Sequence, residues 1–444
     1  MAEMVLGVMA LYIRNNRMED ISFFRKLSIE GEKLGVNIQV FTPEDISAKN
    51  DMVHAHIYNS SLKKWTRKWV PIPQLIYDRC RYQKTYRFQL LKKFRSRYGH
   101  LTFLNRPIMH KWGNQKLLAA NSFIAKHLPD TTRYQSREDL YRFLQNYPLV
   151  YLKPEDGTGG RGIISIRRQS NGLYLIRGRN QGRKIIAPLL VRKEQIPLKL
   201  ASFRLKNGYL IQQGIDITLP DGRVHDFRML IQKNGQGQWE VTGCAGRIGP
   251  PKSVTSNLHG GGSAATMEAL LRRRFGTAQI EEIRSKMETL SHRVVEHVES
   301  KFKHLCEMAL DLAVDRKGGV WLLEINPKPA REVFYQIGER RTYTTAIRRP
   351  LEYAIWLRQN SSKALSKKMD RTSSEKWKPA LSTLRDKVKE LGLHAREEEQ
   401  VASIASLAEE DSLQTERSSE DNRQDNSARQ HSAAREPDDS CTKE

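Results

Sequence analysis

Two short runs in the second half of the chain alternate apolar and polar residues with the two-residue period of a β-strand. The runs are MALDLAVD (308–315) and VWLLEIN (320–326), and the Arg-Lys-Gly-Gly segment between them is a turn signal, so the pattern predicts an antiparallel hairpin. With the turn centred between Lys317 and Gly318, Asp311 lies opposite Glu324, and Asn326 shares their face. Three oxygen-bearing side chains on one face suit a hard cation such as Mg²⁺. The alternative is a solvent-facing polar stripe.

A second predicted hairpin carries a glycine-rich loop. Apolar runs at 150–154 and 163–167 flank the sequence EDGTGGRG. Glycines tolerate positive φ and let backbone N–H groups approach anionic oxygens, so the loop can fold over polyphosphate, and Lys153 adds a positive charge. The β-forming residues after the loop exclude a dinucleotide fingerprint, and no Gly-Lys-Ser/Thr ends the run as a Walker A loop requires. A glycine-rich hairpin without a ligand is the alternative.

The first 41 residues predict a βαβ unit of a parallel sheet: an apolar run at 4–11, a helical segment at 29–35 and a strand at 36–41. The 444 residues allow two or three domains with a substantial core. No Lys or Arg precedes the short first apolar run, and no run approaches the roughly 20 apolar residues of a membrane span. The four cysteines occur singly, without metal-binding spacing. We therefore expect a reduced, cytoplasmic protein without a membrane anchor.

The net charge of +25 is unevenly distributed. Residues 396–444 hold 6 Lys/Arg and 14 Asp/Glu, a net charge of −8, which leaves +33 on residues 1–395. The acidic segment has few apolar residues and is predicted to be disordered. The basic body favours anionic partners. Basic residues interleaved with aromatic ones at 63–69 and 79–97 can stack on single-stranded nucleic acid, but they match no recognition motif, and a solvated basic face is the favoured interpretation.

The order of these features resembles the ATP-grasp superfamily and, more narrowly, the YheC/YheD family of endospore coat-associated proteins. The resemblance covers residues 4–357. It rests on LNRP at Leu104, YLKPEDGTGGRGI at Tyr151, DFRMLIQ at Asp226, SNLHGGG at Ser256 and LLEINPKP at Leu322. It implies an ATP-grasp fold of mixed α/β and α+β class. The expected order is an N-terminal parallel-sheet domain (1–103), a two-lobed ATP-grasp domain with nucleotide between the lobes (104–357), a helical extension (358–395) and the disordered acidic tail (396–444).

The resemblance also implies a set of nucleotide-binding residues. Either Lys111 or Lys116 matches the first nucleotide lysine, and Lys116 is favoured because it sits further into a helix whose Leu117 and Leu118 would pack inward. The segment from Gln212 resembles the hinge that hydrogen-bonds adenine, where many relatives carry Glu. The implied set is Lys116, Lys153, Gly157, Thr158, Gly159, Gly160, Arg161, Gly162, Gln212, Gln213, Ile215 and Asp226.

Metal, phosphate and substrate contacts are implied in the same way. Asp311, Glu324 and Asn326 match the ligands of one or two Mg²⁺ ions, with Mn²⁺ as a substitute. Arg228 and Arg247 match the catalytic arginines that hold the γ-phosphate and an acyl phosphate, a bidentate task that lysine cannot reproduce. Surface arginines in weak salt bridges are the alternative. Asn257, His259 and Gly260 are expected in a substrate loop, where His259 is either an acid or base or a solvated loop histidine.

The implied activity is ATP-dependent ligation of a carboxylate to an amine or thiol, with release of ADP and phosphate. Phosphoryl transfer depends on positioning and charge neutralisation, so no side-chain nucleophile is required. The expected partners are ATP, an unidentified pair of substrates and spore coat proteins, and the expected location is the mother cell or forespore cytoplasm or the coat. The alternative is a nucleotide-binding structural or assembly protein of the spore without turnover. A nucleic-acid binder of unrelated fold would require the five sequence blocks to be coincidental.

Overall fold

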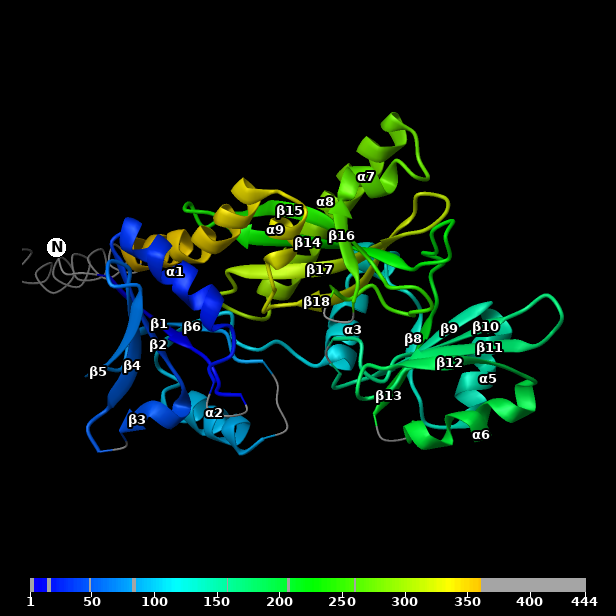
Figure 1. The fold of residues 1–444 in the computed structure, drawn as a ribbon, viewed down its shortest axis with the longest axis horizontal. Coiled ribbons are helices and arrows are strands. Elements are labelled where there is room, and N and C mark those ends of the chain that lie inside the picture. Colours follow the sequence, from blue (N-terminus) through cyan, green and yellow to red (C-terminus); the bar gives the residue numbers. More distant parts are fainter. Residues whose placement is uncertain are drawn as a thin grey trace, which may run out of the picture. The chain divides into compact units, whose positions relative to one another are not determined.

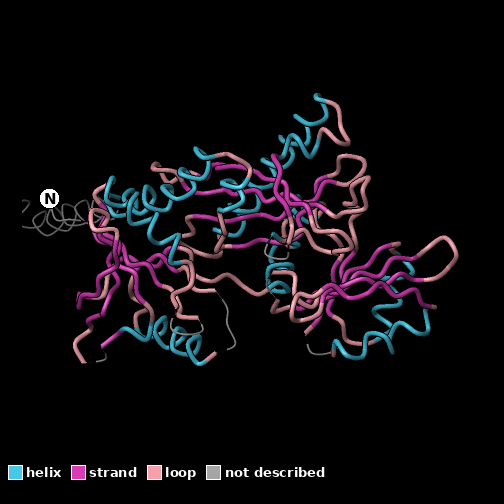
Figure 2. The backbone as a smooth tube through the Cα atoms, viewed as in Figure 1, coloured by secondary structure: helices cyan, strands magenta, loops and turns pink. Residues whose placement is uncertain are grey.

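The computed structural model describes residues 4–13, 17–47, 49–81, 85–157, 159–205, 208–258 and 261–360. The expectations for Thr158, His259, Gly260 and everything beyond residue 360, including the acidic tail, lie outside this part of the chain. Internal contacts separate residues 1–360 from residues 361–444, and the account below concerns the first unit. Its strands form three sheets (Figures 1 and 2). Within the described ranges no helix combines the length and the apolar character needed to cross a bilayer.

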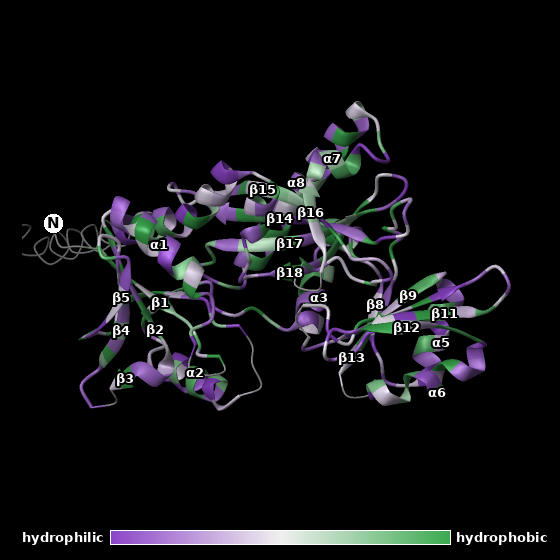
Figure 3. Ribbon diagram, viewed as in Figure 1, coloured by the Kyte–Doolittle hydropathy of each residue, from purple (hydrophilic) through white to green (hydrophobic). Residues whose placement is uncertain are grey.

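The first sheet has a parallel centre with the order β2-β1-β6-β7. The predicted βαβ unit is confirmed, because β1 and β2 pair in parallel and α1 connects them. The helix starts eight residues before the predicted segment, because Phe23, Phe24 and Leu27 extend its buried face. Helix α2 buries Leu91 and Phe94, and most of its length is hydrophilic (Figure 3). The elements are β1 (Met4–Met9), α1 (Ile21–Lys33), β2 (Val36–Phe41), η2 (Pro43–Asp45), β3 (Ile46–Ser47), β4 (Met52–Asn59), β5 (Lys64–Pro71), β6 (Leu75–Asp78), α2 (Tyr86–Arg97) and β7 (Thr102–Leu104).

The second sheet is antiparallel, with the order β12-β11-β10-β9-β13-β8. Strands β9 and β10 form the predicted hairpin around the glycine-rich loop. Helix α5 shares a core with this sheet through Leu140, Phe143 and Leu144. The elements are β8 (Thr131–Arg133), α5 (Arg137–Asn146), β9 (Leu149–Pro154), β10 (Ile164–Arg168), β11 (Tyr174–Arg179), β12 (Ile185–Val191), η3 (Lys193–Gln195), α6 (Ile196–Leu200), η4 (Ala201–Phe203) and β13 (Tyr209–Gln213).

The third sheet is also antiparallel, with the order β16-β15-β14-β17-β18. The long helix α8 packs on it through residues spaced three and four apart, among them Ile283, Met287, Leu290 and Val294. A further helix occupies residues 340–360. The remaining elements are α3 (Lys111–Ala119), α4 (Ser122–Ala125), β14 (His225–Lys233), β15 (Trp239–Ile248), β16 (Ser263–Thr266), α7 (Met267–Leu271), α8 (Thr277–Glu299), β17 (Glu307–Val314), β18 (Val320–Asn326) and α9 (Glu332–Gln336).

The β17–β18 hairpin confirms the predicted pairing of Asp311 with Glu324, although the turn differs from the predicted one. The loop has three residues, 316–318, and the Asp315 N–H donates to the Gly319 carbonyl at 3.0 Å. That turn by itself would set Asp311 opposite Leu323. A β-bulge next to the Asp311 pair shifts the register by one residue, so Glu324 takes the position opposite Asp311. Without the bulge, Glu324 would point to the other face of the sheet.

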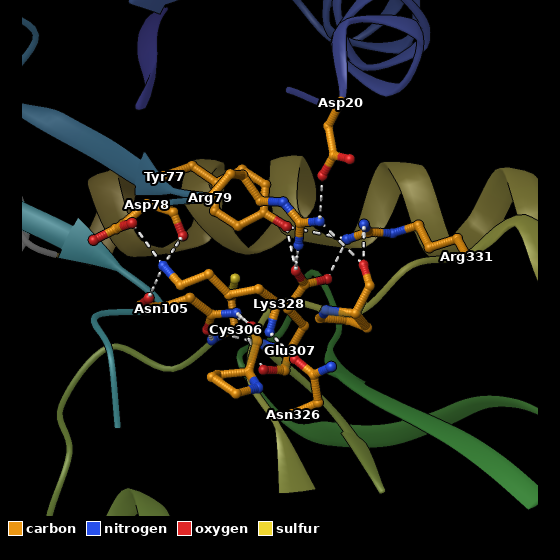
Figure 4. A network of polar contacts seen from close by, with 12 residues as sticks. Asp20, Tyr77, Asp78, Arg79, Asn105, Cys306, Glu307, Asn326, Lys328 and Arg331 are labelled. Carbon is orange, nitrogen blue, oxygen red and sulfur yellow. Dashed lines mark hydrogen bonds and ion pairs between the residues drawn. The ribbon is translucent and has the colours of Figure 1, made fainter. Parts of the chain in front are cut away.

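A buried polar network joins the first sheet to the third (Figure 4). Its centre is Glu307, the first residue of β17, which has no exposed surface. The Glu307 carboxylate accepts hydrogen bonds from the four side chains around it: Tyr77, Arg79, Gln232 and Arg331. Arg79 and Arg331 are themselves 3% and 1% exposed. The start of the β17–β18 hairpin is therefore fixed by charges from the first sheet and from the segment after β18.

A second part of the network lies around Lys328, two residues after the hairpin ends. The Lys328 ammonium donates to Asp78 Oδ1 at 2.6 Å and to the Asn105 carbonyl at 3.2 Å. Arg95 of helix α2 holds the other carboxylate oxygen of Asp78 at 2.6 Å. These contacts tie the carboxyl end of β18 to β6 and β7.

Candidate nucleotide and metal site

A pocket lies where helix α3 and strands β8, β9, β13 and β18 meet. Its polar lining comes chiefly from Lys111, Lys153, Gln212 and Glu324. Its apolar lining consists of Leu118, Leu128, Leu210, Leu322, Leu323 and Ile325. Apolar walls with a few convergent polar groups are typical of a site that holds a planar base and orients it.

Lys153 reaches the pocket from β9. Its ammonium donates to the Gln212 side-chain oxygen, and the Gln212 amide in turn donates to Thr131 Oγ1 at 3.0 Å. Burial, helped by the neighbouring positive charge of Lys111, lowers the pKa of Lys153 to about 8. The lysine is therefore a poorly solvated cation, and an anionic ligand would stabilise its protonated form and raise its pKa.

Of the two lysines on α3, the structure places Lys111 at the pocket. Lys111 Nζ lies 3.7 Å from Glu324 Oε1, whereas Lys116 is exposed and does not line the pocket. Five residues correspond to about 500° of helical rotation, so the two side chains point about 140° apart. The buried Leu118 lies seven residues after Lys111, almost two full turns away. This spacing places Lys111 on the buried face of the helix, and it is the signal in the sequence that could have favoured Lys111 over Lys116. We replace Lys116 with Lys111 in the proposed nucleotide set.

The predicted acid and arginine residues form one cluster across β14, β15 and β17. Arg228 faces Asp311 and Asp226 faces Arg247 in the strand register. Arg228 Nη2 lies 2.9 and 3.0 Å from the two oxygens of Asp311, and Arg247 Nη2 lies 2.9 Å from Asp311 Oδ2. Arg247 Nε also donates to Asp226 at 2.7 Å. Asp226, Arg247 and Asp311 are all buried.

These ion pairs determine the protonation state of the cluster. Burial raises the pKa of Asp311, but Arg228 and Arg247 outweigh it and hold that pKa below the ordinary value. Burial lowers the pKa of Arg247, and Asp226 and Asp311 more than compensate, so its pKa is raised. Asp311 is therefore ionised at neutral pH, as a metal ligand must be.

The predicted metal ligands share a sheet face, and their chemistry fits a hard cation. Asp311 and Glu324 are direct cross-strand partners, and the Glu324 carboxylate is 44% exposed beside Lys111. Asn326 Oδ1 accepts the Lys328 N–H at 3.0 Å and keeps a second lone pair. In the described part of the chain no three or more His, Cys, Asp and Glu side chains are grouped for a metal, and the predicted set contains two carboxylates and one amide. Both oxygens of Asp311 are engaged by arginines, which a metal would displace at least in part.

The glycine-rich loop has the backbone that its sequence predicts. Gly159, Gly160 and Gly162 have φ values of +66°, +75° and +67°, which residues with a side chain rarely adopt. A Cβ on Gly160 would lie 2.8 Å from the Asn257 side-chain nitrogen, so the loop rests directly against the predicted substrate segment. Gly157 has no positive φ, and its role is therefore not a matter of backbone conformation.

Two predicted hinge residues do not reach the pocket. The Gln213 side-chain oxygen accepts the Asp130 N–H at 3.1 Å, and Ile215 is buried with Ile217 and Ala313 in a small core. Gln212 alone of the three lines the pocket. The prediction missed Thr131, which orients Gln212, because no local pattern connects positions 81 residues apart.

The fold is that of the ATP-grasp proteins. The chain belongs to the YheC/D-like ATP-grasp family, whose family model matches residues 100–357. It is 27% identical over 354 residues to the endospore coat-associated protein YheC of Bacillus subtilis (strain 168), covering 78% of this chain and 94% of that protein. It is 28% identical over 346 residues to the endospore coat-associated protein YheD of the same strain, covering 76% and 74%. A glutathione synthetase of Prochlorococcus marinus subsp. pastoris is 26% identical over 246 residues, covering 52% and 68%.

Proposed function

We propose that this chain binds Mg·ATP and uses it to activate a carboxylate as an acyl phosphate, which an amine or thiol then captures. The observation that carries the proposal is that Lys111, Lys153, Gln212 and Glu324 line one pocket. Glu324 belongs to the same hairpin as Asp311. The glutathione synthetase among the relatives is named for a ligation of this class. We assign the two-lobed ATP-grasp domain to residues 104–357 and the N-terminal parallel-sheet domain to residues 1–103.

Each group has a separate task. Gln212 and the apolar walls would hold the base, while Lys111, Lys153 and the N–H groups of the glycine-rich loop would hold the phosphates. Asp311, Glu324 and Asn326 would hold Mg²⁺, which when bound neutralises phosphate charge and orients the terminal phosphoryl group. Released from Asp311, Arg228 would present a bidentate guanidinium face to the transferred phosphoryl group, and Arg247, which also holds Asp226 through two hydrogen bonds, would add its positive charge.

The competing function is a nucleotide-binding structural or assembly protein of the endospore coat. Two curated relatives carry names that place them at the coat, which favours this alternative and suggests the same location for this chain. Isothermal titration of ATP with and without Mg²⁺, together with an assay of ADP release against mixtures of amino acids and thiols, separates the two functions. Metal-dependent binding with stimulated ADP release supports the ligase. Binding without release supports the structural protein, and no binding contradicts both.

Substituting the two lysines of α3 tests the placement of the nucleotide. Lys111→Met should weaken ATP binding about 10- to 100-fold, because one charge-assisted phosphate contact contributes about 1.5–3 kcal/mol. Lys116→Met, on the same helix but exposed, should change the dissociation constant less than about twofold. Equal losses in both variants would contradict the assignment to this face of α3.

The low pKa of Lys153 predicts opposite pH trends for binding and for stability. As the pH rises past about 8, the lysine loses its proton and ATP affinity should fall several-fold. In the unfolded chain its pKa returns to about 10.4, so between the two values the unfolded state binds more protons, and the stability of the nucleotide-free protein should rise with pH. Titration calorimetry and urea unfolding from about pH 7.5 to 9.5 measure both trends. Lys153→Met should lack both, and an unchanged profile in that variant would assign the titration to another group.

A further inference from the structure

The β9–β12 part of the second sheet is basic to an unusual degree. Between Asp156 and Glu194 the chain contains no acidic residue and nine Lys or Arg residues. Three of the arginines belong to the glycine-rich loop or to the neighbouring end of the β11–β12 hairpin: Arg161, Arg179 and Arg183. A basic segment of this kind is often only a solvated surface, so its geometry has to show whether the charges are brought together.

The β11–β12 turn holds Arg183 against the glycine-rich loop. The backbone of Arg183 has φ +69°, a left-handed conformation that residues with a side chain rarely adopt. A Cβ on Gly159 would lie 2.6 Å from Arg183 Nη2, so the guanidinium lies directly against the loop. The Gly162 N–H donates to the Asn180 carbonyl at 3.2 Å and fixes the loop to the same turn.

The three guanidinium groups are close enough to repel one another. Burial and the charge of Arg161 lower the pKa of Arg183, and burial and the charge of Arg183 lower the pKa of Arg179, which is 1% exposed. Among the described residues no carboxylate offsets the shift of Arg183. Arg183 Nε is buried and has no hydrogen-bond partner among those residues. Like charges held together in partly desolvated positions are unfavourable until an anion joins them.

This cluster is electrostatically separate from the nucleotide pocket. The charges that act most strongly on Lys153 are Lys111, Glu324, Asp226 and Asp311, and the cluster contributes none of them. None of the three arginines lines the pocket. The glycine-rich loop contacts Arg183 through Gly159 and the Asn257 segment through Gly160, so the cluster lies beside the predicted substrate segment.

We propose that Arg161, moved here from the nucleotide set that the family resemblance implied, and Arg183, with the charge of Arg179 behind them, form an oxyanion subsite beside the glycine-rich loop that binds a carboxylate or phosphate group of the substrate. The inference rests on the proposed ligase function and narrows its substrate class. One substrate carries an additional oxyanion besides the carboxylate that is activated. Guanidinium groups suit this task because their planar fork matches both carboxylate and phosphate oxygens.

The test uses citrate and inorganic pyrophosphate as probes, titrated without metal and at constant ionic strength into the full chain. Wild type should bind at least one of them, and Arg161→Gln and Arg183→Gln should each weaken that binding about tenfold or more. Arg168→Gln, an exposed residue of β10, is the matched control and should leave the affinity within about twofold. The probe that binds shows whether the subsite prefers carboxylate or phosphate.

ADP titration with Mg²⁺ on the same variants distinguishes this subsite from the nucleotide site. Arg183→Gln should leave ADP affinity within about twofold, and citrate or pyrophosphate should raise the thermal midpoint of wild type but not of the variant. An equal loss of ADP affinity would assign the cluster to the nucleotide and overturn the proposal. So would equal weakening by Arg168→Gln, or no binding of either probe to wild type. If wild type itself does not bind ADP, the result would instead contradict the proposed function.

Discussion

Asp311→Asn is expected to abolish the dependence of ATP binding on Mg²⁺ and to lower ADP release about a thousandfold, equivalent to about 4 kcal/mol of transition-state stabilisation. The substitution keeps the shape of the side chain and removes the charge that a hard cation requires. Titration of ATP with and without Mg²⁺ measures the first effect, and a coupled assay of ADP measures the second. Metal-stimulated binding that persists in Asp311→Asn would exclude Asp311 as a ligand.

Loss of the charge also leaves Arg228 without an ionised carboxylate partner and Arg247 with Asp226 alone, so the variant should be less stable. The double variant Arg228→Gln, Asp311→Asn removes one positive and one negative charge and serves as the control for folding. Its thermal midpoint should recover toward wild type, while metal-dependent binding should stay absent. If the double variant regained metal-dependent binding, the loss in Asp311→Asn would reflect charge imbalance rather than a missing ligand.

The contacts of Arg228 and Arg247 with Asp311 predict that Mg²⁺ binds weakly in the absence of nucleotide. Because four guanidinium contacts occupy both oxygens of Asp311, Mg²⁺ without nucleotide has to displace them with no anion to receive the arginines. A phosphate group removes that obstacle, because it can accept the guanidinium donors that Asp311 releases. Metal and nucleotide should therefore bind cooperatively, in line with the reciprocity of linked equilibria.

Local patterns in the sequence predicted the hairpins but not their details. Alternation in the two runs around residues 316–319 was enough to predict β17 and β18, because strand period and turn residues act over a few positions. The pairing of Asp311 with Glu324 was predicted from a two-residue turn, whereas the molecule reaches it through a three-residue turn and a bulge at Leu323. The longer turn shifts the pairing by one residue, and the bulge shifts it back by one residue. The two differences cancel at Asp311 and Glu324, and no sequence rule specifies a bulge of this kind.

Residues brought together from distant strands were beyond a local prediction. Arg228 and Asp311 are 83 positions apart, and only the order β15-β14-β17 places them opposite each other. Family resemblance supplied both residues, but it gave no reason to expect that they bond to each other. The preference for Lys116 differs from the placement of Lys111 at the pocket for another reason: the packing of Leu117 and Leu118 was assigned by adjacency, although helical faces repeat every three to four residues. The burial of Glu307 among two arginines left no signal in the sequence, because alternation predicts a strand with one solvent-facing side, whereas all eight residues of β17 are buried.

Glu307→Ala is expected to destabilise residues 1–360 by about 3–5 kcal/mol, which is the usual cost of removing one partner from a buried ion pair. Glu307 has no exposed surface, and its removal would leave the guanidinium groups of Arg79 and Arg331 buried without a carboxylate (Figure 4). Urea unfolding of wild type and variant measures the difference. Glu268→Ala, which breaks the exposed pair with Arg272 on the same chain, is the matched control and should cost less than about 1 kcal/mol. A loss below about 1 kcal/mol in Glu307→Ala would show that the network is not a structural ion-pair centre.

The same substitution should weaken nucleotide binding, although Glu307 lies outside the pocket. Asp311 follows four residues later in β17, and Lys328 fixes the other strand of the hairpin to Asp78, so the two strands that carry the proposed metal ligands are positioned from the first sheet. Loosening β17 at Glu307 should change the metal-dependent part of ATP binding while leaving the metal-independent part intact. Equal losses in both parts would instead indicate partial unfolding of the whole pocket. Glu307→Gln keeps one acceptor oxygen, and so two of the four accepted hydrogen bonds, but it replaces the other oxygen with a donor NH2 group and removes the charge. It should fall between wild type and Glu307→Ala in both stability and metal-dependent binding, because the two buried arginines still lose their counter-ion.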